Sequence, residues 1–208
     1  MGRSVTVSGQ GRASAPYDVA TLRLAASARA ANPSDASARA TYAMGAMRAA
    51  VVQGGADEST LQTTSVSLNP VHDPWPTVVA YEASLSLSVR LTDLSHVGSV
   101  LVSAVQAGGD GARVEGIAFS HDDAAALEGE ARAAAWADAR VKAEQYAGLA
   151  GQALGEVRHV VEGASRGGAV PVARAALMSA EAGGVAVDAG EGTVTAVVTV
   201  TWALGPSV

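Results

Sequence analysis

The residues that could form a catalytic nucleophile lie in a glycine-rich stretch of the second half of the chain. Gly163-Ala164-Ser165-Arg166-Gly167 matches the G-x-S-x-G turn that exposes the serine of many hydrolases, and an expected strand precedes it. In that family the base histidine follows the serine in the chain. Here every histidine precedes Ser165: His72, His96, His121 and His159. We therefore expect no enzymatic activity and keep a Ser165 hydrolase only as the alternative.

Two other groups of residues are of types that bind cofactors or metals. Gly9-Gln10-Gly11 resembles the start of a dinucleotide fingerprint, but Ser14 replaces the third glycine and a strand is expected to follow, so a hairpin turn is the better interpretation. His121-Asp122-Asp123 combines ligand types, yet adjacent residues rarely converge on one ion. Ser120 and Asp123 fit a helix capping box instead. We expect neither a cofactor nor a metal.

A loop bounded by prolines is the best candidate for a binding site. It covers residues 70–76 and contains His72, Asp73 and Trp75 between prolines that stiffen the backbone. Such a loop could bind a small molecule or a client protein. The alternative interpretation is an exposed loop tip with no binding role.

Composition excludes several classes of protein. The chain has 208 residues, a formal charge of −6 and no cysteine, which excludes disulfides and cysteine-ligated metals. A nucleic-acid partner is not expected, because binding to phosphates requires a basic face. No apolar run reaches the ~20 residues of a membrane span, and no export signal is recognised at the start. The sequence as given therefore predicts a soluble cytoplasmic protein, or a periplasmic or secreted one if an export signal has been removed.

The first half of the chain reads as two strands, a helix and two strands. Asn32-Pro33-Ser34 predicts a helix start and Gly54-Gly55 its end, because Asn and Ser cap helices and glycine terminates them. Alternation of side chains predicts the strands. The expected elements cover residues 5–8, 19–28, 35–53, 61–68 and 78–91.

The second half reads as a helix, a strand, a long helix and two strands. The expected elements cover residues 94–107, 113–119, 120–148, 154–161 and 193–204. Alanine recurs at every fourth position of the long helix, which permits close packing on a sheet or helix: Ala131, Ala135, Ala139, Ala143 and Ala147. Glu128/Arg132 and Asp138/Lys142 have the spacing of helix-surface ion pairs. The remaining segment, residues 163–192, is predicted to be a long loop.

These elements predict an α+β fold. Its sheets are expected to be mixed and mostly antiparallel, with two shorter helices and one long Ala-rich helix in the order ββαββ-αβαββ. One domain over residues 1–208 is expected, with two lobes at residues 1–91 and 92–208.

Segments along almost the whole chain resemble the SIMPL domain family of unknown function, which includes bacterial periplasmic immunogenic proteins and proteins of oxidative-stress defence. The most specific match joins Glu130-Ala131-Arg132 to Asp138-Ala139-Arg140-Val141-Lys142-Ala143-Glu144. The others include Val5 to Gly11, Pro16 to Ala20, Leu61-Gln62-Thr63, Leu68-Asn69-Pro70, Tyr81-Glu82-Ala83, Gly116 to Phe119, and Leu154-Gly155.

The resemblance implies an α+β domain without an agreed enzymatic activity, and self-assembly of some members into large rings. It implies structural roles for the matching residues: Asp18, Thr63, Tyr81, Arg132, Ala139, Lys142, Ala143, Gly151 and Gly155. Our leading hypothesis is accordingly a non-enzymatic, self-associating scaffold, a homo-oligomer and possible ring, with a stress-associated role. A binding module that uses the 70–76 loop is the alternative.

Overall fold

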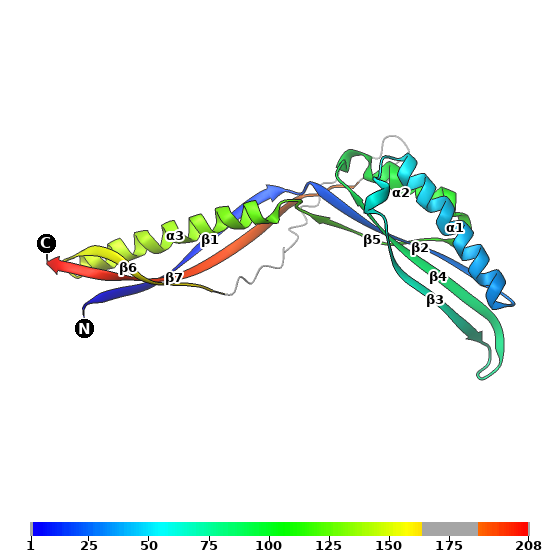
Figure 1. Ribbon diagram of the computed structural model, residues 1–208, viewed down its shortest axis with the longest axis horizontal. Coiled ribbons are helices and arrows are strands. Elements are labelled where there is room, and N and C mark those ends of the chain that lie inside the picture. The colour runs from blue at the N-terminus through cyan, green and yellow to red at the C-terminus, as the bar shows by residue number, and fades with distance from the viewer. Residues whose placement is uncertain (1, 164–186, 208) are drawn as a thin grey trace. The chain divides into compact units, whose positions relative to one another are not determined.

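Three α-helices and seven strands in two antiparallel sheets make up the part of the chain that the structure describes (Figure 1). The structure is a computed structural model, and it describes residues 2–163 and 187–207. The order of elements is the predicted ββαββ-αβαββ, and the α+β class is confirmed. Within the described residues, no helix is both long enough and apolar enough to cross a bilayer.

The chain divides into two units, each with its own sheet. Of the described residues, unit 1 contains 2–16, 121–163 and 190–207, and unit 2 contains 17–120 and 187–189. The residue ranges of these units differ from those of the expected lobes, 1–91 and 92–208. The reason is that the first strand pairs with the last one, so both ends of the chain belong to unit 1.

Unit 2 is a four-stranded sheet with two helices. Its elements are β2 (Val19–Ala30), α1 (Pro33–Gln53), β3 (Gln62–His72), β4 (Val78–Leu91), α2 (Val97–Gly108) and β5 (Ala112–Ser120). The strand order β3-β4-β2-β5, with every neighbour antiparallel, is the β-α-β-β-α-β topology of ferredoxin-like domains.

Local sequence explains the helices of unit 2, and alternation explains its core. The Asn32 side chain accepts a hydrogen bond from the Asp35 N–H at 2.9 Å and caps α1, and the helix ends at Gly54. Alternate residues of β2 and β4 face the two helices and are buried with them: Leu22, Leu24, Met47, Val51, Leu87, Val89, Val97 and Val100.

Unit 1 is a three-stranded sheet with one long helix. Its elements are β1 (Ser4–Pro16), α3 (Ala124–Leu149), β6 (Gln152–Glu162) and β7 (Glu191–Ser207), in the order β1-β7-β6. Figure 1 shows α3 running along β1 and β7. The alanine stripe of α3 forms the contact and is almost fully buried: Ala131, Ala135, Ala139, Ala143 and Ala147.

The prediction of a hairpin turn at Gly9-Gln10-Gly11 is wrong, because these residues lie in the middle of β1. The glycines are there because α3 lies very close. A Cβ atom at Gly9 would sit 2.5 Å from the Ala139 nitrogen, and one at Gly11 would collide with the backbone of Ala131 and Ala135. Glycine is therefore required by a distant helix rather than by a local turn.

Three other local predictions also need correction. Ser120 still pairs with Val19 in the sheet, so the capping box is wrong; Asp123 alone caps α3 and accepts from the Ala126 N–H at 3.0 Å. Strand β3 continues to His72, so residues 70–72 of the predicted 70–76 loop belong to the strand. Strand β7 begins at Glu191, inside the predicted 163–192 loop, and residues 164–186 of that loop lie outside the described part.

Candidate functional site

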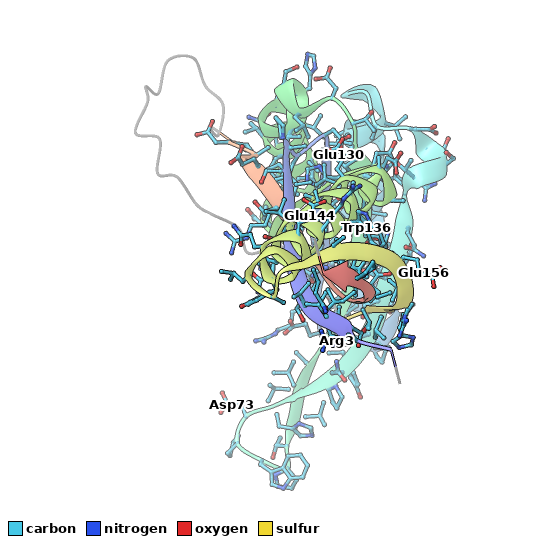
Figure 2. All side chains as sticks on the ribbon, turned by 90° about the vertical axis from the view of Figure 1, so that its left-hand side faces the viewer. Arg3, Asp73, Glu130, Trp136, Glu144 and Glu156 are labelled. Atoms are coloured by element: carbon cyan, nitrogen blue, oxygen red, sulfur yellow. The ribbon has the colours of Figure 1, made fainter. Side chains whose placement is uncertain are left out.

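The predicted binding residues His72, Asp73 and Trp75 lie at the turn of the β3–β4 hairpin. Figure 2 shows Asp73 at the far end of this hairpin. The Asp73 N–H donates to the Thr77 carbonyl at 3.0 Å, which closes the turn. The structure brings His72 and Trp75 together, with ring centroids 4.4 Å apart and planes tilted by 50°.

This turn forms a tip with exposed apolar side chains. Trp75 is 77% exposed, and Val78 and Val79 at the start of β4 are 44% and 51% exposed. A ligand site normally buries most of a small molecule, which a side chain as exposed as Trp75 does not achieve. Large exposed apolar side chains are found at protein–protein contacts. The geometry therefore fits a protein partner better than a small molecule.

Further exposed apolar side chains lie on β3 and on unit 1. On β3, Val66 is 70% and Leu68 is 45% exposed. Unit 1 has two exposed sets, one on α3 and one on β6: Val141, Tyr146 and Leu149, then Val157, Val160 and Val161. Each unit therefore carries apolar surface that could be buried by a partner.

The family-motif residues Asp138 and Lys142 form hydrogen bonds with backbone groups at the outer edge of β1. The Asp138 carboxylate accepts from Lys142 Nζ at 2.7 Å and from the Gln10 N–H at 2.8 Å, and Lys142 Nζ also donates to the Ser8 carbonyl at 3.1 Å. The hydrogen bonds from Lys142 and Gln10 lower the pKa of Asp138 below its usual value. Helix spacing predicts the ion pair; the contact with the strand was missed.

Arg132 links α3 to the edge strand β6. Its guanidinium donates to Glu162 at 2.7 Å and to Glu128 at 3.0 Å, and these contacts, with Glu162 first, raise the pKa of Arg132. Beside it, Trp136 and Val160 line an apolar groove of about 330 Å³. The ion pair of Arg132 with Glu128 was expected from their spacing. The pair with Glu162 could not be predicted from the sequence, because Glu162 is 30 residues away.

Sequence reasoning also missed a pocket of unit 2, of about 380 Å³. Asp57 and Asp93 line it together with Thr60, Arg90 and His96. Hydrogen bonds from Ser59 lower the pKa of Asp57, and those from Ser95 and His96 lower the pKa of Asp93. The repeated Asp-x-Ser spacing, Asp57 to Ser59 and Asp93 to Ser95, is the signal that could have found this pair.

The other motif residues lie in the framework of the two units. Thr63 lies on β3, and Tyr81 packs against a small alanine cluster under α1. The backbone of Asp18 donates to the Ser120 carbonyl at 3.3 Å. Gly151 follows α3, and a Cβ atom at Gly155 would lie 3.0 Å from the Ala203 carbonyl. Ala139 and Ala143 are fully buried on β1 and β7.

Ser165 lies outside the described residues, so the candidate nucleophile has no structural account. Within residues 2–163 and 187–207, no three His, Asp or Glu side chains gather closely enough to hold a metal ion.

Comparison with known proteins identifies relatives over nearly the whole chain. Residues 5–202 match the model of SIMPL, a family described as proteins of unknown function (DUF541). The chain is 30% identical over 182 residues to the 26 kDa periplasmic immunogenic protein of Brucella melitensis, a match that covers 82% of this chain and 70% of the relative. The protein of the same name from Brucella abortus gives the same identity and coverage.

Proposed function

The chain belongs to the SIMPL family, and we propose that it acts as a non-enzymatic scaffold that assembles from several copies of itself. The observation that carries this proposal is the exposed apolar surface in both units. Val66, Leu68 and Trp75 represent it in unit 2, and Tyr146, Leu149 and Val160 in unit 1. An assembly larger than a dimer needs two different surfaces on each copy, and a ring forms when contacts between them close.

The native mass in solution tests the scaffold directly. Light scattering behind size exclusion, at low and at high salt, should give a mass of several subunits at both concentrations. Apolar contacts persist in salt, whereas contacts between exposed charges are screened. A monomer at both salt concentrations contradicts the proposal.

The location and the stress-associated role are further parts of the proposal. Two relatives are named as periplasmic proteins, which supports a periplasmic location for this chain rather than a cytoplasmic one. Fractionation of native cells should then recover the protein with the periplasmic marker. A strain without the gene should grow more slowly than its parent after peroxide treatment, and equal growth contradicts the stress role.

The second candidate function is binding of a client protein by the hairpin tip. The close contact of His72 with the 77% exposed Trp75 favours it. Trp75→Ala should weaken protection of a thermally unfolded model client, citrate synthase, against aggregation. Tyr42→Ala is the matched control, because Tyr42 is 81% exposed on α1 of the same unit. Equal protection by both variants and the wild type contradicts this function.

A Ser165 hydrolase is the enzymatic alternative. A broad screen of p-nitrophenyl esters should give the same low rate for the wild type and for Ser165→Ala. If the wild type hydrolyses an ester and Ser165→Ala does not, the proposal of a non-enzymatic protein is wrong.

A further inference from the structure

In the part of the chain that the structure describes, the two sheets have four outer edges, at β1, β6, β3 and β5, and these differ in how well they are protected. We propose that the β3 edge binds β3 of a second copy as an antiparallel strand, with the two-fold axis at Ser67. This inference rests on the proposed self-assembly and names one of its interfaces. An edge strand leaves alternate N–H and C=O groups unpaired, so it can accept another strand unless the protein blocks it.

The β1 edge is blocked by its own helix. Asp138 accepts from the Gln10 N–H, and Lys142 donates to the Ser8 carbonyl, at 2.8 and 3.1 Å. These are backbone groups that an added strand would need. Strand addition at this part of β1 would have to break both contacts.

The β5 and β6 edges carry irregularities and charges that disfavour strand addition. Strand β5 is shifted in register beside Gly116, whose φ is +154°. Strand β6 has three register shifts against β7 and carries Glu156, Arg158 and Glu162. Bulges and charged side chains are the usual means by which proteins protect an edge.

The β3 edge has little of this protection. Residues 59–71 contain no Asp, Glu, Lys or Arg, so two copies can approach here although each has a net charge of −6. Ser65 to Val71 pair with β4 without interruption. Val66 is 70% and Leu68 is 45% exposed, so neither is covered by a helix.

The short sequence around Ser67 is complementary to itself. With the axis at Ser67, Val66 of one copy lies opposite Leu68 of the other, and Ser65 lies opposite Asn69. Pairing would end at Pro70, which has no N–H, opposite the bulge beside Thr64. The two Ser67 hydroxyls would face each other as Ser8 and Thr199 do within unit 1, where the oxygens are 2.8 Å apart.

Charge substitutions test this pairing. In V66K/L68K, lysines would lie opposite each other across the axis, and like charges there are destabilising. In V66K/L68E, each lysine would lie opposite a glutamate. By light scattering we expect the mass of V66K/L68K to fall at least twofold below that of the wild type, and that of V66K/L68E to be retained. Circular dichroism and melting temperature check that both variants fold.

Crosslinking gives a second test that leaves the edge intact. Because the chain contains no cysteine, Ser67→Cys introduces one thiol per copy. Residues opposite each other on antiparallel strands have Cα atoms about 4.5–5.5 Å apart, within the range for a disulfide. Oxidation should convert most Ser67→Cys chains to dimers on a non-reducing gel. Ser34→Cys, on an exposed serine of α1, should remain mainly monomeric.

The outcomes separate this inference from the proposed function. A monomeric wild type overturns both. An assembled wild type, with V66K/L68K unchanged in mass or Ser67→Cys crosslinked no more than Ser34→Cys, overturns the β3 interface alone. Dissociation of V66K/L68E overturns the axis at Ser67.

Discussion

The contact between α3 and β1 gives the most direct quantitative prediction, made for Gly11→Ala. A Cβ atom at Gly11 would lie 2.8 Å from the Ala134 carbonyl carbon and still closer to the backbone of Ala131 and Ala135, whereas ordinary contact begins at 3.4 Å. These are backbone atoms of a helix, so no side chain can rotate away. Helix α3 would have to move by more than half an ångström along the buried alanine stripe.

The cost follows from two opposing effects. Alanine in a strand is favoured over glycine by about 0.5–1 kcal/mol, and overpacking of a close contact costs about 1–3 kcal/mol. Because the clash is with the backbone, we expect a value near the top of that range and a net loss of about 2 kcal/mol. In a chain of this length that lowers the melting temperature by roughly 4–8 °C.

Gly129→Ala is the matched control, since it makes the same substitution in α3 where a Cβ atom would meet no atom within 4 Å. It should stabilise the helix by about 1 kcal/mol, because glycine is the poorer helix former. Thermal unfolding followed by circular dichroism compares the two variants with the wild type. An unchanged or raised melting temperature for Gly11→Ala would refute the close packing of α3 on β1.

Three further predictions concern other contacts. Asn32→Ala removes the cap of α1 and should cost about 1 kcal/mol, measured by urea unfolding with Ser34→Ala as the control; equal midpoints would contradict the cap. The pKa of Asp138 is lowered from 3.8 in the folded chain, so its contribution is present above that pH and is lost as pH falls through the lowered value. Asp138→Asn should therefore have a lower urea midpoint of unfolding than the wild type at pH 7, and the difference in midpoint should shrink at pH 3. An equal difference at both pH values would contradict a stabilising role of the ionised Asp138 carboxylate. Trp75→Ala should leave the melting temperature within 1–2 °C of the wild type, about the size of a surface substitution, since Trp75 is 77% exposed; a larger fall would show that the tip is part of the fold.

Local patterns predicted the elements whose limits are set by nearby residues. Strand β4 spans 78–91 as alternation indicates, and α1 ends where Gly54 follows its last turn. The alanine stripe correctly indicated close packing of the long helix.

The failures have a common physical cause, which is contact between distant parts of the chain. Gly9 and Gly11 look like turn residues, but a helix more than a hundred positions later requires them to be glycine. Similarly, nothing beside Arg132 indicates Glu162, and helix spacing cannot show that Asp138 and Lys142 reach the β1 backbone. At the candidate site, residue types indicated the 70–76 loop as a binding segment. The exposure of its side chains and the lack of protection along the β3 edge could be seen only in the structure.

The native mass of the wild-type chain tests the central claim most directly. One chain has a mass of 20.6 kDa. Sedimentation equilibrium over a hundredfold range of protein concentration should give a mass of several chains at the upper end, as self-assembly through exposed apolar surfaces and the β3 edge requires. A mass of one chain over the whole range would contradict it.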